Sequence, residues 1–173
     1  MNVLLITSAT KGSNTDTLNK EFLRQMKEKN HSVKILQAKL ANHCVSCRAC
    51  EKTGICVQSD PFQISTKNLE KVIVFSGAVH NFGLNSALYA AWQRISFMCD
   101  QNIFGLILCS GSDGRYGGVD IVKEQFQRFD EFCGTTTVEI VNKVTGDKRL
   151  PLTDIDKAKI SKLIDNLERG FQQ

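Results

Sequence analysis

Residues 7–18, TSATKGSNTDTL, follow a short apolar run and end where a helical pattern begins. The apolar run occupies residues 3–6, and Leu18, Phe22 and Met26 then follow at intervals of four residues. A buried strand, a loop and an amphipathic helix produce such a pattern. We therefore expect residues 7–18 to form the first strand-to-helix connection of an α/β domain.

This connection is rich in hydroxyl groups, and it carries Gly12 and Asn14 close to the expected helix start. The first turn of a helix presents unpaired backbone N–H groups and a partial positive charge, so hydroxyls placed there can bind a phosphate monoester. The alternative is an ordinary helix cap made by Ser13 and Asp16, with no ligand. Neither G-x-x-x-x-G-K-[ST] nor G-x-G-x-x-G occurs in it, which excludes a P-loop and a Rossmann dinucleotide turn here.

The rest of the chain continues the alternation of strands and helices. Further strands are predicted at residues 32–36, 71–75, 103–109 and 135–141, and helices at residues 15–28, 86–99, 119–131 and 154–171, with a short helical stretch at 62–69. Such alternation predicts a five-stranded parallel sheet covered by helices on both faces. The pattern alone leaves two doubly wound strand orders open.

The composition describes one ordinary domain, residues 1–173, without a membrane or nucleic-acid partner. Of the 173 residues 42% are apolar, and the net charge of +4 is scattered rather than clustered. The apolar runs are too short to cross a bilayer, and the N-terminus is a strand rather than a signal peptide, so a cytoplasmic location is expected. Nucleic-acid binding requires a clustered basic patch. A mild positive balance instead suits an anionic small molecule such as NADPH.

Three loops should form one ligand site. They are residues 7–14, 76–85 and 110–118, each following a predicted strand and each rich in Gly, Ser or Asn. In open α/β sheets ligands bind beyond the carboxyl ends of the strands, and such loops allow the backbone to approach a ligand closely. In the second loop His80, Asn81 and Phe82 offer hydrogen bonds and a flat apolar face, which suit a heteroaromatic ring. An ordinary connecting loop with Phe82 in the core is the alternative.

Two segments resemble the flavodoxin-like NAD(P)H-dependent FMN reductase superfamily. Its first loop has the pattern G-S-P-x-x-x-S-N-T, which Ser8, Ser13, Asn14 and Thr15 match. Its third-strand loop has a pattern that Val79, Phe82, Leu88, Ala90 and Arg94 match without gaps, and Asn81-Phe82-Gly83 is similar to the quinone reductase and azoreductase branches. Prolines of the family are replaced by Ala9, Ala78 and Asn85. Loss of the prolines predicts a more flexible loop.

The resemblance implies a flavodoxin-like three-layer sandwich with strand order 2-1-3-4-5. It implies bound FMN, NAD(P)H as electron donor, a quinone, flavin, nitro, azo or metal acceptor, and a homodimer. The FMN contacts that it implies are Ser8, Ser13, Asn14 and Thr15 at the phosphate, and Ala78, Val79, His80, Asn81, Phe82, Gly83, Ser110, Gly111, Gly114, Tyr116, Gly117 and Gly118 around the ring.

Two further assignments stay open at the level of sequence. His80 is the one candidate for a catalytic hydrogen-bond donor to the flavin or to a substrate carbonyl, and packing at the loop edge is its alternative role. The aromatic residues Tyr89, Trp92 and Phe97 fall on one predicted helix, where they fit either a dimer interface or the core.

The seven cysteines include a compact group of four. Cys44, Cys47, Cys50 and Cys56 form C-x2-C-x2-C-x5-C in a loop, residues 41–60, that follows the second strand. Four thiolates so spaced can ligate a [4Fe–4S] cluster, whereas structural zinc prefers two separated hooks. Free or redox-active thiols are the other alternative.

The motif resembles the iron–sulfur flavoprotein branch, which implies ferredoxin as an alternative donor. Cys99, Cys109 and Cys133 are predicted to be buried thiols without chemistry. The competing non-enzyme hypothesis is a flavodoxin-like domain without flavin that senses redox state or binds a partner through the cysteine loop.

Overall fold

The computed structural model describes residues 1–112, 114–146 and 148–173. Helices and strands follow the chain in the order β1 (Asn2–Thr7), α1 (Asn14–Glu28), β2 (Ser32–Gln37), η1 (Ala38–Leu40), α2 (Ala49–Thr53), η2 (Thr66–Asn68), β3 (Val72–His80), β4 (Gly83–Leu84), α3 (Ser86–Ser96), β5 (Ile103–Ser110), α4 (Gly114–Gly117), α5 (Val119–Cys133), β6 (Thr136–Val144) and α6 (Asp154–Phe171). Among these residues no helix is long and apolar enough to cross a membrane.

The described strands form a six-stranded sheet in the order β2-β1-β3-β5-β6, with the short β4 paired to β3 outside this path. The five strands of the path run parallel, and β4 is antiparallel to β3. Since β5 and β6 are the fourth and fifth strands of the path, this order is the predicted 2-1-3-4-5. The predicted fold class is therefore confirmed.

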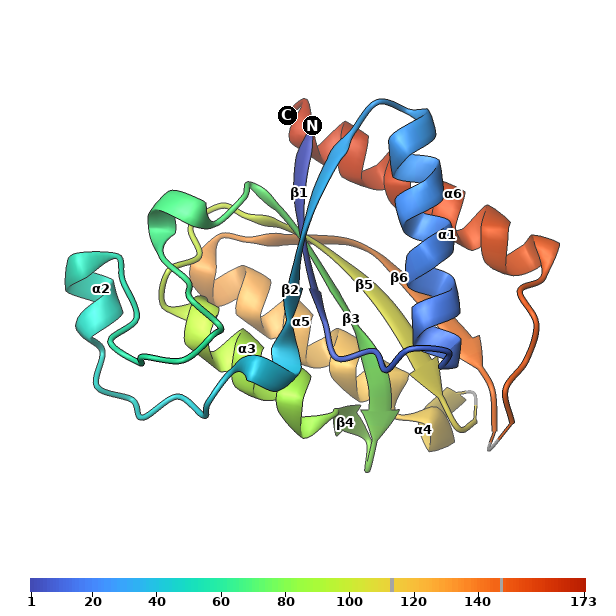
Figure 1. Ribbon diagram of the computed structural model, residues 1–173, viewed down its shortest axis with the longest axis horizontal. Helices are drawn as coiled ribbons and strands as arrows, with labels where there is room; N and C mark the ends of the chain where they lie inside the picture. The colour runs from blue at the N-terminus through green and yellow to red at the C-terminus, as the bar shows by residue number, and fades with distance from the viewer. Residues whose placement is uncertain (113, 147) are drawn as a thin grey trace.

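Helices cover both faces of the sheet, as Figure 1 shows. On one face α1 and α6 pack Phe22, Met26 and Leu163 against the sheet, and on the other α3 and α5 pack Trp92 and Phe126. The central strands are apolar at nearly every position because both of their faces are covered. The layered packing leaves the carboxyl ends of the strands, with their loops, at one edge of the sheet.

Two predicted elements differ from those observed. The helical stretch predicted at residues 62–69 is wrong, since only Thr66–Asn68 form a 3₁₀ turn. Phe62 and Ile64, two residues apart, are both buried in the core, which an extended segment achieves and a helix does not. The third strand extends past its predicted end to His80, because Ser76, Gly77 and Ala78 continue to pair with β5.

An ion pair on α1 makes the stability of the fold depend on pH. The Arg24 guanidinium donates hydrogen bonds of 3.0 and 2.7 Å to the Glu21 carboxylate. It lowers the pKa of Glu21 from 4.5 to about 2, although burial opposes the shift. Because the pKa in the folded state is depressed, the stabilisation is complete above about pH 4.5 and is lost as the pH falls toward 2.

We expect the free energy of unfolding of Glu21→Gln to vary less between pH 4.5 and 2 than that of the wild type. Urea unfolding at several pH values measures this. Glu124→Gln is the control, since Glu124 also pairs with an arginine on its own helix, Arg128 four residues later, but on an exposed face of α5. Identical pH profiles for the wild type and Glu21→Gln would contradict the assignment.

Candidate functional site

A hollow of about 440 Å³ lies beyond the carboxyl ends of β1, β3 and β5. Its size falls within the roughly 300–1,000 Å³ range of small-molecule sites. We call it the strand-end hollow; its lining residues are Ser13, Asn14, Thr15, Ala78, Val79, His80, Asn81, Phe82, Cys109, Ser110, Gly111, Ser112, Tyr116, Gly117, Thr145 and Gly146. The structure thus brings residues of the three candidate loops to one place, together with the segment that follows β6.

The N-terminus of α1 forms one wall of the strand-end hollow. Ser13 is the N-cap residue, and its Oγ accepts a hydrogen bond of 3.2 Å from the backbone N–H of Asp16. Within the part of the chain that the structure describes, the backbone N–H groups of Asn14 and Thr15 have no hydrogen-bond partner. The wall can therefore offer two N–H groups, the remaining Ser13 hydroxyl hydrogen and the positive end of the helix dipole to an anion.

Two of the four candidate phosphate ligands use their side chains elsewhere. The Asn14 side chain donates to the carbonyl of Lys148 at 2.8 Å and accepts from the N–H of Leu150 at 2.9 Å. The Ser8 hydroxyl accepts a 2.7 Å hydrogen bond from Asn85 Nδ2 and is not part of the lining. Ser13 and Thr15 lie on the wall of the strand-end hollow, although Thr15 is buried and its side chain shares a hydrogen bond with the Cys109 thiol.

The loop after β3 is a tight hairpin rather than a flexible connection. His80 pairs with Gly83, and the two residues between them, Asn81 and Phe82, have φ angles of 49° and 63°. Two consecutive left-handed residues are typical of a type I′ turn, whose twist matches the flanking strands. Asn85 stands where the family has a proline, and the loop remains ordered there because the Asn85 side chain donates hydrogen bonds to Ser8 Oγ and to the carbonyl of Ala78.

The hairpin presents a flat side chain to the site. Phe82 has 52% of its surface exposed, and Gly118 packs directly behind it, where a Cβ atom would lie 2.4 Å from the Phe82 Cα. Gly83 lies in β4, beside the lining rather than in it. His80 is exposed on the wall of the strand-end hollow, where a hydrogen bond to a bound ligand is feasible.

The loop after β5 contributes the opposite wall. Ser110 Oγ donates to the carbonyl of Ser112 at 2.7 Å and accepts from Asn142 Nδ2 at 3.0 Å, which fixes the start of the loop. Gly111 faces open space, where a Cβ would meet no atom within 4 Å. Gly114 begins α4, and residue 113 lies outside the described residues. Tyr116, 70% exposed, stands at the mouth.

Thr145 and Gly146 complete the lining and were absent from the residues expected from sequence. The N–H of Thr145 donates to the carbonyl of Ser110 at 2.9 Å, so the segment after β6 is joined to the loop after β5. The rule that ligands bind beyond the carboxyl ends of parallel strands applies to the fifth strand as well as to the others. Applied there, it would have identified these residues.

The four clustered cysteines line a second, small hollow, together with Arg94 and Phe97. Burial raises the pKa of the Cys50 thiol, and the neighbouring Cys56, Cys44 and Cys47 raise it further. Among the described residues, however, no three His, Cys, Asp or Glu side chains are placed to hold one metal ion. The four thiols therefore lie around one hollow, but they are not arranged to coordinate a metal ion.

The other three cysteines are poor nucleophiles. Burial raises the pKa of Cys99 to about 12 and also raises those of Cys109 and Cys133. Such thiols stay protonated at neutral pH and are unreactive. Of the three thiols predicted to be buried, only Cys109 is, and it also lines the strand-end hollow; Cys99 and Cys133 are partly exposed, so for these two the prediction is wrong.

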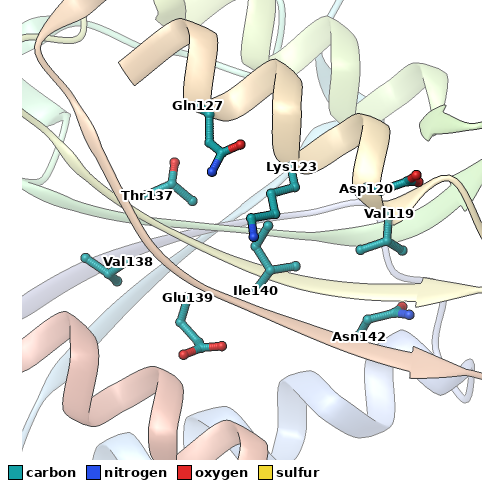
Figure 2. A pocket seen from close by; sticks show the side chains of 9 residues that line it. All are labelled: Val119, Asp120, Lys123, Gln127, Thr137, Val138, Glu139, Ile140 and Asn142. Atoms are coloured by element: carbon teal, nitrogen blue, oxygen red, sulfur yellow. The ribbon is translucent and has the colours of Figure 1, made fainter. Parts of the chain in front are cut away.

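A hollow of similar size, about 440 Å³, lies between α5 and the free edge of β6. Figure 2 shows Lys123 and Gln127 reaching toward β6 and Glu139 on the far side. Its lining comes from the first half of α5, including Val119 and Asp120 of the first turn, and from β6. It includes no glycine loop, and the carboxylates of Asp120 and Glu139 disfavour a phosphate there. We therefore assign the chemistry to the strand-end hollow.

The strand order and the position of the strand-end hollow define a flavodoxin-like α/β protein. A Streptococcus pneumonia TIGR4 flavodoxin superposes with a TM-score of 0.63 at 10% identity, over 98% of this chain and 99% of the other. An FMN-dependent NADH-azoreductase from Bacillus anthracis str. Ames Ancestor gives 0.60 at 15% identity, over 97% and 98%. A flavone reductase gives 0.68 at 12% identity, over 99% of this chain and 63% of the other.

The sequence assigns the chain to a family, which the structural similarity alone does not do. Residues 1–145 match the family described as NADPH-dependent FMN reductase, so the chain belongs to that family and is an oxidoreductase. No curated protein sequence matches it. The family implies FMN and NAD(P)H, and does not specify the electron acceptor.

Proposed function

We propose that this protein transfers electrons from NAD(P)H, through FMN held in the strand-end hollow, to a small-molecule acceptor. Quinones, free flavin, nitro or azo compounds and metal ions are the candidate acceptors. The observation that carries the proposal is the N-terminus of α1, with the Ser13 hydroxyl and the N–H groups of Asn14 and Thr15 available on its wall. These groups suit the phosphate of a flavin mononucleotide.

The other walls suit the isoalloxazine ring. The backbone of residues 78–82 and the open face of Gly111 provide hydrogen-bonding groups and close approach, and Phe82 supplies an apolar face. The redox chemistry, hydride acceptance from NAD(P)H and electron transfer to the acceptor, belongs to FMN. The protein's own residues bind and orient the flavin and shield it from water, and His80 is the imidazole of the lining that can exchange a hydrogen bond with a bound ligand.

The decisive experiment combines a visible spectrum of the purified protein with NADPH and NADH oxidation assays. Bound FMN and NAD(P)H oxidation that depends on it would support the proposal. A protein that neither retains nor takes up FMN would refute it and leave only the fold. Assays with one acceptor of each class then rank the acceptors by kcat/KM.

A second candidate function, single-electron transfer through an iron–sulfur cluster, is favoured by the four cysteines around one hollow. Arg94 reaches the same hollow with a fully buried side chain that pairs with Asp60, and its Nε has no hydrogen-bond partner among the described residues. Because Asp60 already balances the charge of the guanidinium, what Arg94 offers a cluster with thiolate ligands is this remaining N–H donor. Ferredoxin would then be an alternative electron donor. The present placement of the thiols does not yet fit a cluster, so no step is derived through one.

Iron and FMN assays on protein purified without oxygen decide between the two functions. About four irons per chain would support the cluster, as a [4Fe–4S] site requires. They should be lost in Cys47→Ser and kept in the control Cys133→Ser, whose thiol lies at the end of α5. Flavin without iron would reject the cluster and leave free thiols.

We also propose that the protein is a cytoplasmic homodimer. Tyr89 and Phe97 of α3 and Phe132 of α5 are exposed aromatic residues, whereas Trp92 is buried and stacks on Phe126. Exposed aromatic side chains suit an interface. Light scattering after size exclusion would test it, and a monomeric mass across the working concentration range would reject it.

A further inference from the structure

The segment that follows β6 runs beside the phosphate end of the strand-end hollow. We call residues 145, 146 and 148–150 the strap. One amide side chain holds it at two points, since Asn14 donates to the carbonyl of Lys148 and accepts from the N–H of Leu150. Thr145 fixes the other end through its N–H bond to Ser110. The strap is therefore attached to both walls of the site.

The strap carries two consecutive cations, Lys148 and Arg149, to the start of α1. The Nη1 atom of Arg149 lies 3.6 Å from the position that a Cβ atom would take on Gly12. Gly12 directly precedes the cap residue Ser13 and directly follows Lys11. Arg149 and Lys11 are thus gathered at the N-terminus of α1, although they lie far apart in the sequence.

The same helix turn carries a negative charge that opposes anion binding. Asp16 Oδ2 accepts the N–H of Gly12 at 2.8 Å, so that N–H is not available to a ligand. Hydrogen bonds from Lys20 and from this N–H lower the pKa of Asp16, and Lys11 lowers it further, so the carboxylate is ionised at neutral pH. A phosphate monoester carries about −1.5 to −2 charges at pH 7. Lys20 already pairs with Asp16 at 2.8 Å, so the charge that remains to be offset is that of the phosphate itself, and a further nearby cation would neutralise it.

We infer that Arg149, positioned by Asn14 through the strap, neutralises the phosphate of the bound flavin. The inference rests on the proposed function. It reassigns Asn14, which the family pattern placed on the phosphate, to a positioning residue that acts through the strap. A guanidinium also adds directed hydrogen bonds to phosphate oxygens, which a dipole alone does not provide.

Comparison of FMN with riboflavin, which lacks the phosphate, tests the inference. Dissociation constants of both flavins are measured on full-length protein stripped of flavin, by quenching of flavin fluorescence, for the wild type, Arg149→Gln, Arg149→Lys and Asn14→Ala. Arg128→Gln is the matched control, since it removes an exposed arginine of α5 that pairs with Glu124 away from the site. Each measurement is repeated at low and high salt.

We expect Arg149→Gln and Asn14→Ala to weaken FMN binding about tenfold while riboflavin binding is unchanged, because one charge-assisted contact is lost. Arg149→Lys should restore part of the affinity, and Arg128→Gln should behave as the wild type. The preference of the wild type for FMN over riboflavin should fall with salt, and that of Arg149→Gln should fall less.

Equal losses for FMN and riboflavin in Arg149→Gln, or an unchanged affinity for FMN, would overturn the inference. In both cases the wild type still binds FMN, so the proposed function survives. If the wild type binds neither flavin, the proposed function fails, and the role of the strap fails with it. The wild-type FMN titration therefore separates the two failures.

Discussion

Gly118→Ala is expected to destabilise the protein by about 2–5 kcal/mol and to remove FMN from the purified protein. Gly118 precedes α5 with a φ of 70°, a backbone angle that costs an alanine about 1–2 kcal/mol. Its Cβ would also lie 2.4 Å from the Cα and 3.0 Å from the carbonyl carbon of Phe82. Backbone cannot rotate away as a side chain can, so the hairpin that carries Phe82 must move.

Gly134→Ala separates the two parts of this effect. Gly134 follows α5 with a φ of 67°, yet a Cβ there meets no atom within 4 Å. The control should therefore show the backbone cost alone and keep its flavin. Urea unfolding and the ratio of flavin to protein absorbance measure both variants. Equal stabilities, or a Gly118→Ala protein with full flavin content, would show that the hairpin does not depend on Gly118 for its position.

The alternation of strands and helices was predictable because its determinants are local, whereas the strand order came only from the family resemblance. Apolar runs such as residues 72–75 and 103–108 are continuous, as strands covered on both faces require, and the helices between them repeat at helical spacing. The turn of Asn81 and Phe82 was not predictable, since a phenylalanine at positive φ contradicts its local preference. That turn forms because β3 continues to pair with β5 up to Ala78.

The lining of the strand-end hollow was predictable where it belongs to the connections after β1, β3 and β5. Ser13 and Thr15, in the connection from β1 into α1, lie on its wall. Asn14 matches the same pattern, but its side chain is taken by the strap, more than 130 residues later in the chain. No local sequence pattern predicts such a contact, because it depends on the position in the fold of the segment that follows β6.

The position of the cysteine loop also depends on contacts between residues far apart in the sequence, which local patterns do not predict. Asp60 accepts a hydrogen bond from the N–H of Asn42 at 2.8 Å and another from the N–H of Phe62 at 3.1 Å, which joins the two ends of the loop. The buried Arg94 of α3 pairs with Asp60 and lies over the Phe62 ring. The family pattern includes Arg94 but does not predict that Arg94 pairs with Asp60. The loop is thereby held against α3, whose first turn lies beside the strand-end hollow.

The second large effect is expected from the double variant Ser13→Ala/Thr15→Ala. The Ser13 hydroxyl accepts the N–H of Asp16, which leaves its hydrogen free for a phosphate oxygen, and Thr15 lies on the same wall. A hydrogen bond to a charged group contributes about 1.5–3 kcal/mol, so loss of two should weaken FMN binding at least about a hundredfold. Riboflavin, which lacks the phosphate, should bind nearly as before.

Loss of the helix cap alone could also weaken binding, and Thr153→Ala controls for it. Thr153 caps α6 by accepting the N–H of Asp156 at 3.2 Å, the same distance as the bond from Asp16 to Ser13. Both variants should lose about 1 kcal/mol of stability from the cap, and only the double variant should lose its flavin. Flavin content that falls equally in Thr153→Ala, or stays unchanged in the double variant, would place the phosphate elsewhere. Because the backbone N–H groups of Asn14 and Thr15 remain in the double variant, any residual affinity for FMN measures what the helix N-terminus contributes without hydroxyls.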